Sequence, residues 1–263
     1  MKAAAAAFLA ALVVVPLGAA ATPQRVLLGI SFPEGFSARQ MVDRVAAVRR
    51  IAIQRRHVTP ALTAKAYAAA LDKTQPPTAF KPFMHRKSIE GFLFPSLYKF
   101  GPADSAKSLV ALQLQEFQRR FATVTRAVDA NPYAVLTVAS MVEREAAVAP
   151  ERPLVAAVIY NRLAQNMPLG IDATLRYGLG IPGTRPLTKA QLQSDSPYNT
   201  RRFRGLPPTP IGNPGLASLR AAANPASVDY LYYVRIPNTV RHFFTADYTE
   251  FCAKVVEYGY GGC

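Results

Sequence analysis

Two glutamates lie within an otherwise apolar stretch of the sequence, and they are the strongest candidates for chemistry. Glu143 and Glu145 belong to segment 134–149, in which most other residues are apolar or small. A carboxyl group in such surroundings loses hydration, so its pKa rises and it can hold a proton near neutral pH. A carboxyl group of that kind can act as a general acid. The segment therefore predicts acid–base chemistry carried by a glutamate.

Helical periodicity separates the two glutamates without choosing between them. On a helix, Glu145 stacks with Val142 and Val148, and Glu143 stacks with Leu136 and neighbouring small residues. The two side chains point about 200° from each other, so they cannot act as a pair on one face. Either glutamate can instead pair with an arginine and anchor the helix end. The arginines in question are Arg144, Arg152 and Arg162.

Other catalytic arrangements are absent from the sequence. The three histidines, His57, His85 and His242, are far apart and show no metal-ligand spacing. The sequence also lacks a G-x-S-x-G nucleophile elbow and a glycine-rich phosphate loop. We therefore expect neither a metal nor a cofactor.

The glutamates are expected to lie on a helix that begins at Asn131 and Pro132, an N-cap followed by a first-turn proline, and runs to Pro150. The stretch up to Gly215 is then rich in Pro and Gly, and we expect ordered, functional loops there. The other expected elements are strands at 25–30, 230–236 and 242–245, and helices after the N-cap candidate Ser37 and over 60–71, 103–128, 151–165 and 187–193. The order predicts an α+β fold: a small α/β module, then a mixed domain with a helical catalytic segment and a C-terminal β-hairpin.

Length and composition indicate a globular protein, and the N-terminal segment indicates export. The 263 residues are 50% hydrophobic and 18% charged, which is enough apolar material for one large or two small domains. The segment Ala3–Ala21 carries no charge and follows Lys2, as in a secretion signal, and it is either cleaved or retained as a membrane anchor. In an exported chain, Cys252 and Cys263 are expected to form a disulfide.

The net charge of +15 favours an anionic partner. Such a surplus would ordinarily point to nucleic acid, but export argues against that partner. Arginine is the more frequent of the two basic residues, and its planar guanidinium suits bidentate contacts with carboxylates.

Seven segments of the sequence form a pattern that runs from about residue 25 to 250. The segments are Phe32–Gly35, Ile89–Pro95 with Tyr98–Phe100, Ala139–Glu145, Glu151–Ala156 with Asn161–Leu163, Asp172–Thr174 with Tyr177–Gly178, Ser196–Thr200 and Gly205–Ile211. In order and spacing, they resemble the endolytic murein transglycosylases of the MltG (YceG-like) family.

The resemblance implies an endolytic lytic transglycosylase of peptidoglycan. Such an enzyme cleaves the β-1,4 bond between MurNAc and GlcNAc and leaves a 1,6-anhydroMurNAc end, which terminates or releases nascent glycan strands. It also implies a LysM-like module at 22–88 and a catalytic domain at 89–263, after the signal or anchor at 1–21. Its location would be the cell envelope and its partners peptidoglycan synthases. A non-catalytic peptidoglycan-binding protein and a muramidase-type hydrolase remain alternatives.

The resemblance identifies Glu145 as the catalytic residue. One carboxyl group suffices because the muramoyl 6-hydroxyl is the nucleophile, whereas a hydrolase needs two carboxylates about 5 to 10 Å apart. The resemblance also implies substrate-binding residues, each of which can instead be a hydrogen bonder that fixes a loop. These are Glu90, Asn161, Asp172, Thr174, Tyr198, Asn199 and Thr200.

Several positions depart from the family pattern. Ala146 stands where threonine is common, Arg201 where an aromatic residue often follows Asn-Thr, and Thr209 where glycine is usual. Gly170–Thr174 also replaces the usual Gln-Thr-Asp-Pro-Thr. The departures leave Glu145 in place and bear on the substrate contacts.

Overall fold

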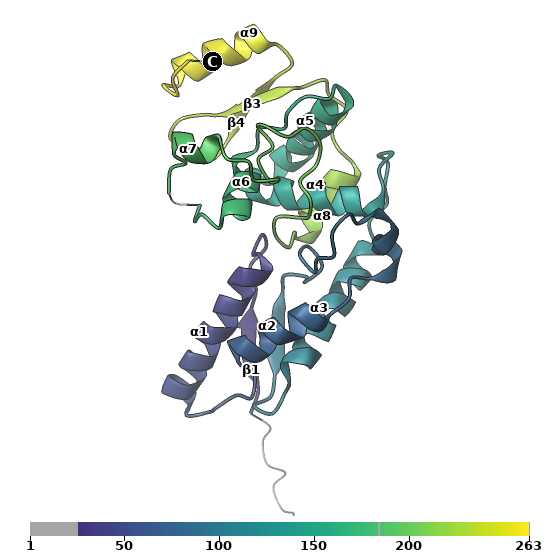
Figure 1. Cartoon of the computed structure of the whole chain (residues 1–263), viewed down its shortest axis with the longest axis vertical. Coiled ribbons are helices and arrows are strands. Elements are labelled where there is room, and N and C mark those ends of the chain that lie inside the picture. The colour runs from purple at the N-terminus through teal and green to yellow at the C-terminus, as the bar shows by residue number, and fades with distance from the viewer. Residues whose placement is uncertain (1–25, 184, 263) are drawn as a thin grey trace, which may run out of the picture.

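The computed structural model describes residues 26–183 and 185–262, which form a smaller and a larger lobe (Figure 1). The elements in chain order are β1 (Leu28–Ser31), α1 (Ala38–Arg56), α2 (Ala64–Lys73), the 3-10 helix η1 (Thr78–Phe83), β2 (Leu97–Phe100), α3 (Ala106–Phe121), α4 (Pro132–Glu145), the 3-10 helix η2 (Ala149–Glu151), α5 (Arg152–Ala164), α6 (Asp172–Leu179), α7 (Lys189–Leu192), α8 (Leu216–Ala223), β3 (Tyr232–Arg235), β4 (His242–Thr245) and α9 (Tyr248–Glu257).

The smaller lobe is built around the antiparallel pair β1 and β2. Leu28 lies opposite Phe100 and Ser31 opposite Leu97. Helix α1 begins at Ser37, which forms a capping box with Gln40, so the predicted N-cap is confirmed. Helices α1, α2 and the first half of α3 supply the rest of this core. Its largest fully buried side chains are Ile30, Phe32, Met41, Tyr67 and Leu93.

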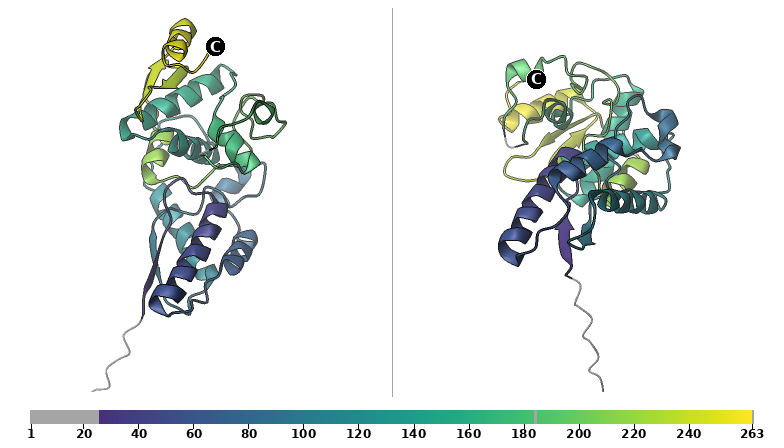
Figure 2. Two further views of the ribbon diagram at one scale, coloured as in Figure 1. Left: turned by 90° about the vertical axis from the view of Figure 1, so that its left-hand side faces the viewer. Right: turned by 60° about the horizontal axis from the view of Figure 1, so that its bottom comes forward.

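The larger lobe is centred on α4, in which Tyr133 and all residues from Val135 to Val142 are buried. Helices α5 and α8 pack against α4, and the second half of α3 adds Phe117 to this core. The antiparallel hairpin of β3 and β4 lies between α9 and the rest of the lobe (Figure 2). The expected α+β fold, with a helical segment that carries the glutamates and a C-terminal hairpin, is confirmed.

The end of α4 differs from the prediction. The helix begins at Asn131 and Pro132 as expected, but it ends at Glu145 instead of continuing to Pro150. Pro150 has no N–H to donate to the carbonyl of Ala146, so a continued helix would have lost its hydrogen bond there. Ala146 instead takes an extended conformation. Glu145 is therefore the last residue of the helix, and Val148 does not extend its apolar stack.

Other helices also differ from the sequence prediction. Helix α3 is shorter than 103–128. The sequence predicts no helix at the positions of α6, α8 and α9. Helix α6 ends at Gly180 in the left-handed region, but it has no side-chain N-cap, so its start has no capping signal in the sequence.

The boundary between the lobes does not coincide with the domain boundary predicted at residue 88. Strand β1 needs β2 as a pairing partner for its backbone groups, and β2 follows that boundary by several residues. The smaller lobe therefore takes in β2 and half of α3 as well.

Two sequence predictions involve residues outside the described ranges. The signal or anchor at 1–21 is one, and the Cys252–Cys263 disulfide is the other, because Cys263 is not described. Within residues 26–183 and 185–262, no helix combines the length and the apolar character needed to cross a membrane.

Candidate functional site

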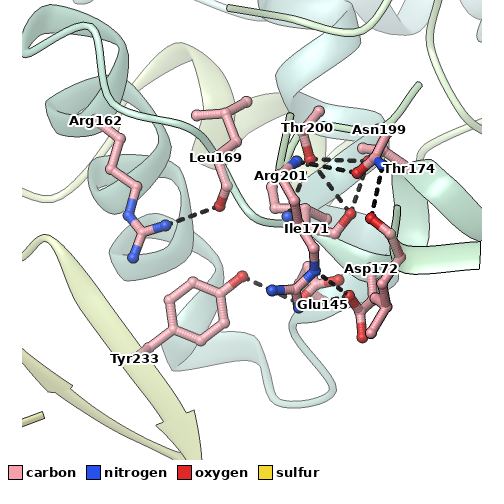
Figure 3. A network of polar contacts seen from close by, with 11 residues as sticks. Glu145, Arg162, Leu169, Ile171, Asp172, Thr174, Asn199, Thr200, Arg201 and Tyr233 are labelled. Carbon is pink, nitrogen blue, oxygen red and sulfur yellow. Dashed lines mark hydrogen bonds and ion pairs between the residues drawn. The ribbon is translucent and has the colours of Figure 1, made fainter. Parts of the chain in front are cut away.

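Glu145 presents its carboxyl group at the C-terminal end of α4, facing the β3–β4 hairpin (Figure 3). The hydroxyl of Tyr233 donates a hydrogen bond of 3.0 Å to Oε2 of Glu145. The other oxygen, Oε1, has no hydrogen-bond partner among the described residues. The group thus has one fixed oxygen and one oxygen left for another donor or acceptor.

The surroundings of Glu145 favour its protonated form. Burial raises the pKa of this carboxyl, and the negative charge of Asp172 raises it further. The hydrogen bond from Tyr233 and the positive charges of His242 and Arg144 act in the opposite direction on the pKa. The end of α4 adds partial negative charge from its free carbonyls, which also disfavours a carboxylate. Glu145 therefore keeps its proton to a higher pH than an exposed glutamate, as a general acid requires.

The hairpin that carries Tyr233 is anchored by a buried contact between Glu151 and His242. Glu151 accepts a 3.0 Å hydrogen bond from the backbone N–H of His242, and its second oxygen lies 2.8 Å from Nδ1 of the same histidine. The His242 ring packs edge-on against the Tyr233 ring, with centroids 5.4 Å apart. Within the described chain, no third His, Cys, Asp or Glu joins this pair to form a metal site. The pair therefore orients Tyr233 toward Glu145.

Arg162 fixes the same hairpin from α5. Its Nε donates a 2.6 Å hydrogen bond to the carbonyl of Leu231, and Nη1 donates to the carbonyl of Leu169 at 2.9 Å. Arg162 thereby ties the start of β3 to the loop that leads into α6 (Figure 3).

Sequence reasoning missed the contribution of Tyr233, His242 and Glu151. Tyr233 is 88 residues from Glu145, and His242 is 91 residues from Glu151. The strand pattern at 230–236 predicts alternating faces, but it does not say which other segment a face meets. The contacts depend on tertiary packing, for which the sequence carries no local signal.

Asp172 and Arg201 form an ion pair beside Glu145 (Figure 3). Nη2 and Nε of Arg201 lie 2.7 and 2.9 Å from Oδ1 of Asp172. Both side chains remain exposed to solvent at this pair, by 46% for Arg201 and 43% for Asp172. Arg201, which departs from the family pattern, thus pairs with Asp172, whose negative charge raises the pKa of Glu145.

Three predicted substrate-binding residues are buried and bonded within the protein. Thr200 accepts a hydrogen bond from the backbone N–H of Ile171 at 3.0 Å, and its hydroxyl lies 3.0 Å from that of Thr174. Asn199 donates to the carbonyls of Leu192 and Ser194. These bonds hold the loop 192–200 against the start of α6, so the structure gives Thr174, Asn199 and Thr200 loop-fixing contacts.

Asn161 and Tyr198 also make internal bonds. Asn161 donates to the carbonyls of Val228 and Tyr230, both at 2.9 Å, and so holds the segment before β3. Tyr198 is partly exposed, and its hydroxyl lies 2.8 Å from that of Thr209. The role of each as a substrate-binding residue stays a prediction.

Glu90 lies between the two lobes, apart from the Glu145 cluster, and is 4% exposed. Its two oxygens accept from the backbone N–H of Ala38 at 3.0 and 3.1 Å, from Nδ2 of Asn213 at 2.9 Å and from the hydroxyl of Tyr177 at 3.0 Å. Asn213 also donates to the carbonyl of Phe36 at 2.8 Å. We call this set, Phe36, Ala38, Glu90, Tyr177 and Asn213, the interlobe joint.

Glu143 points in another direction from Glu145 and has a structural partner on each oxygen. Oε2 accepts from the backbone N–H of Gly215 at 2.9 Å, at the start of α8, and Oε1 lies 3.8 Å from Nη2 of Arg152. The side chain is 7% exposed. The anchoring arrangement considered for either glutamate is therefore the one that Glu143 adopts.

Comparisons with known proteins agree with this architecture. The chain is 32% identical over 216 residues to an endolytic murein transglycosylase of Bacillus subtilis, covering 80% of this chain and 59% of the relative. It is 29% identical over 229 residues to an endolytic murein transglycosylase of Streptococcus pneumoniae, covering 80% of this chain and 40% of the relative. The chain thus spans well under two thirds of the length of either relative.

A solved structure shares the fold, and a family model shares the sequence pattern. The crystal structure of a yceG-like protein from Listeria monocytogenes matches with a TM-score of 0.68 and 28% identity, over 84% of this chain and 74% of that one. The model of the YceG-like family matches residues 4–257. The resemblance carried by the seven sequence segments is confirmed, and the chain belongs to the YceG-like family.

Proposed function

We propose that the protein is an endolytic lytic transglycosylase that cleaves the β-1,4 bond between MurNAc and GlcNAc in peptidoglycan. The observation that carries the proposal is the carboxyl of Glu145, whose pKa is raised by burial and which has one oxygen without a partner among the described residues. The two relatives named endolytic murein transglycosylases support the choice of substrate.

The chemistry uses Glu145 twice. The protonated carboxyl donates its proton to the glycosidic oxygen as the bond from that oxygen to C1 of MurNAc breaks. The 6-hydroxyl of the same MurNAc then bonds to C1, and its proton passes to the Glu145 carboxylate. The products are a 1,6-anhydroMurNAc end and a GlcNAc 4-hydroxyl, and Glu145 has its proton again. Water takes no part, and the nucleophile is already tethered to the reacting carbon.

The surroundings of Asp172 favour this reaction over hydrolysis. A hydrolase would need a second carboxylate as nucleophile or base within about 5 to 10 Å of the acid. Asp172 is the carboxylate whose charge acts on Glu145, but Arg201 binds one of its oxygens through two N–H groups. The two N–H groups occupy Oδ1, which makes this oxygen less available to attack C1 or to activate a water. Its negative charge can still stabilise positive charge that develops on the sugar.

In this proposal, the seven predicted substrate-binding residues divide into two that contact the glycan and five that act through the parts of the fold that they hold. Asp172 and Tyr198 expose side-chain atoms and contact the glycan. The others act through the loops and the interlobe joint that they hold, because their polar atoms already form hydrogen bonds within the protein. These are Glu90, Asn161, Thr174, Asn199 and Thr200.

The proposal extends to the place where the enzyme works. We propose a location in the cell envelope, with segment 1–21 as signal or anchor and peptidoglycan synthases as partners that supply nascent strands. The smaller lobe, with its β1-α1-α2-β2 order, would serve as a LysM-like module that holds glycan. The uncharged segment and the names of the relatives support this part of the proposal.

The test is the identity of the products from purified peptidoglycan, measured by mass spectrometry. Anhydro ends from the wild-type protein would support the proposal. Reducing ends would indicate the muramidase-type hydrolase, and intact strands that still bind the protein would indicate a non-catalytic wall-binding protein. Glu145→Gln should remove the products, and Glu143→Gln serves as the matched control in the same helix.

A further inference from the structure

A cavity of about 680 Å³ lies between the two lobes, beside α6. The first turn of α1 and the segment before Glu90 form one wall, and α4 and α6 form the opposite wall. Glu145 does not line this cavity, but its chain neighbour Arg144 does. The lining residues that matter here are Arg39, Ser88, Arg144, Arg176, Tyr177 and Tyr198.

Three guanidinium groups face this cavity without a carboxylate to pair with. Nη1 of Arg39 reaches to 3.2 Å from where a Cβ would stand at Gly180, so this side chain extends from α1 toward the end of α6. Arg144 donates one hydrogen bond, to the carbonyl of Gly35 at 3.1 Å, and Arg176 donates to the carbonyls of Pro182 and Arg185. Among the described residues, none of the three arginines forms an ion pair.

The carboxylates near the cavity offset these charges only in part. Two of them, Glu90 and Asp43, line the cavity with the three arginines; both oxygens of Glu90 are bonded within the interlobe joint, and Asp43 is exposed on α1. Burial lowers the pKa of the Arg144 guanidinium, the negative charges of Glu90 and Glu145 raise it, and the charge of Arg176 lowers it. A guanidinium has five N–H donors, so most of those on Arg144 stay available. The cavity is therefore arranged to accept an anion.

We propose that this cavity binds carboxylates of the peptide stem attached to muramic acid, as a second part of the substrate site. This inference rests on the proposed function and names the part of the substrate that the cavity recognises. Peptide stems carry free carboxylates along the chain and at its end, and arginine binds carboxylates through two parallel N–H groups. Tyr177 and Tyr198, with ring centroids 5.2 Å apart, give the cavity an aromatic wall for the aliphatic parts of the stem.

The spacing along α6 suits such a substrate. Arg176 is one helical turn from Asp172 along α6, a rise of about 6 Å. An extended stem of four residues spans about 13 Å from its muramic acid. A stem whose muramic acid lies beside Asp172 is therefore long enough to reach Arg176.

The experiment compares two forms of the same glycan strands, one with peptide stems and one from which an amidase has removed them. The readout is the ratio of kcat/KM on peptide-bearing strands to kcat/KM on bare strands. Arg39→Gln should lower this ratio about tenfold, which corresponds to about 1.4 kcal/mol, the scale of one charge-assisted hydrogen bond. Arg39→Glu should lower it further, because the new carboxylate repels the stem.

The matched control is Arg55→Gln, which removes the same charge from the last turn of the same helix, outside the cavity. The control should leave the ratio unchanged. An unchanged ratio in both Arg39 variants overturns the inference, and so does an equal loss in Arg55→Gln, which would indicate general attraction by the basic surface.

A binding measurement separates this inference from the proposed function. If the wild-type protein releases no anhydro product from either substrate, the proposed function fails and no ratio exists. Titration of the isolated stem tetrapeptide into the wild-type protein then decides the inference. Saturable binding that Arg39→Gln weakens about tenfold supports a stem site, and absence of saturable binding overturns it.

Discussion

Glu90 and Glu145 are both largely enclosed, and in both burial raises the pKa, yet their surroundings differ in kind. Glu90 accepts hydrogen bonds from Ala38, Asn213 and Tyr177, and both of its oxygens are occupied. Glu145 accepts one, from Tyr233, on one oxygen. A raised pKa alone therefore does not identify a catalytic acid. What distinguishes Glu145 is that it retains capacity to exchange a proton with a substrate.

The two glutamates also differ in which end of a helix they lie at. Glu90 meets the first N–H of α1, where the helix favours negative charge, and so it stabilises the joint between the lobes. Glu145 lies at the last residue of α4, where the helix disfavours negative charge. The hydrogen bonds that Glu90 accepts stabilise the interlobe joint. Glu145 instead occupies a position in which its negative charge costs stability, as is common for catalytic groups.

The largest expected effect is on activity in Glu145→Gln. The amide cannot donate a proton to the glycosidic oxygen, so formation of anhydro products should fall by about 10² to 10⁴-fold. The thermal midpoint should stay the same or rise, because the variant removes a charge that burial and the helix end disfavour. Product analysis by mass spectrometry and a thermal melt measure the two quantities. Full activity in this variant would contradict the assignment and make Glu143 the next candidate.

The next largest effect is on stability in Glu90→Ala. The variant leaves the N–H of Ala38 and the amide of Asn213 without their acceptor inside the joint, which should cost about 2 to 4 kcal/mol of unfolding free energy. Urea unfolding measures the loss. Glu90→Gln keeps an acceptor at the same place and should lose less. If Glu90→Ala retained wild-type stability but lost activity, Glu90 would act in the reaction, as Glu145 does, and not in joining the lobes.

Tyr233→Phe should change the site more mildly. The variant removes the hydrogen bond that lowers the pKa of Glu145 and orients its carboxyl, so kcat/KM should fall about tenfold. Because the pKa of Glu145 then rises, the acid stays protonated to higher pH and the basic limb of the pH–rate profile should move upward. Tyr232→Phe, on the same strand, is the control and should leave the profile in place. A fall in rate with no movement of the profile would reduce Tyr233 to a structural role.

The sequence predicts the parts of this comparison that depend on short-range patterns. Asn131 and Pro132 locate the start of α4, Ser37 locates the start of α1, and the apolar neighbours of Glu143 and Glu145 indicate burial of both. These features follow from capping and periodicity, which act within a few residues.

The parts that the sequence does not predict depend on contacts between distant segments. Periodicity left Glu143 and Glu145 equivalent, and only the positions of Gly215 and Tyr233 distinguish them. The resemblance implies that Glu90 binds substrate, because its segment belongs to the family pattern. In the structure, it meets Asn213, 123 residues later in the chain. A segment can therefore carry a family pattern because it joins two lobes, without carrying the chemistry.

The smallest expected effect is the pH dependence that Glu90 gives to stability. Burial, opposed by its hydrogen bonds, raises the pKa of Glu90 to about 7. Below about pH 4.5, the group is protonated in both the folded and the unfolded chain. Between pH 4.5 and 7 the unfolded chain loses this proton while the folded chain keeps it, so the stabilising contribution declines as pH rises.

Glu90→Gln lacks this titration, so the wild-type protein should lose on the order of 1 kcal/mol more stability than the variant between pH 5 and pH 6. Urea unfolding of both proteins at the two pH values measures the difference, and the raised pKa of Glu145 contributes equally to both. Parallel losses would mean that the donors from Ala38, Asn213 and Tyr177 keep Glu90 ionised throughout. The joint would then hold a permanent charge. Of the two glutamates, only Glu145 would be able to release a proton near neutral pH.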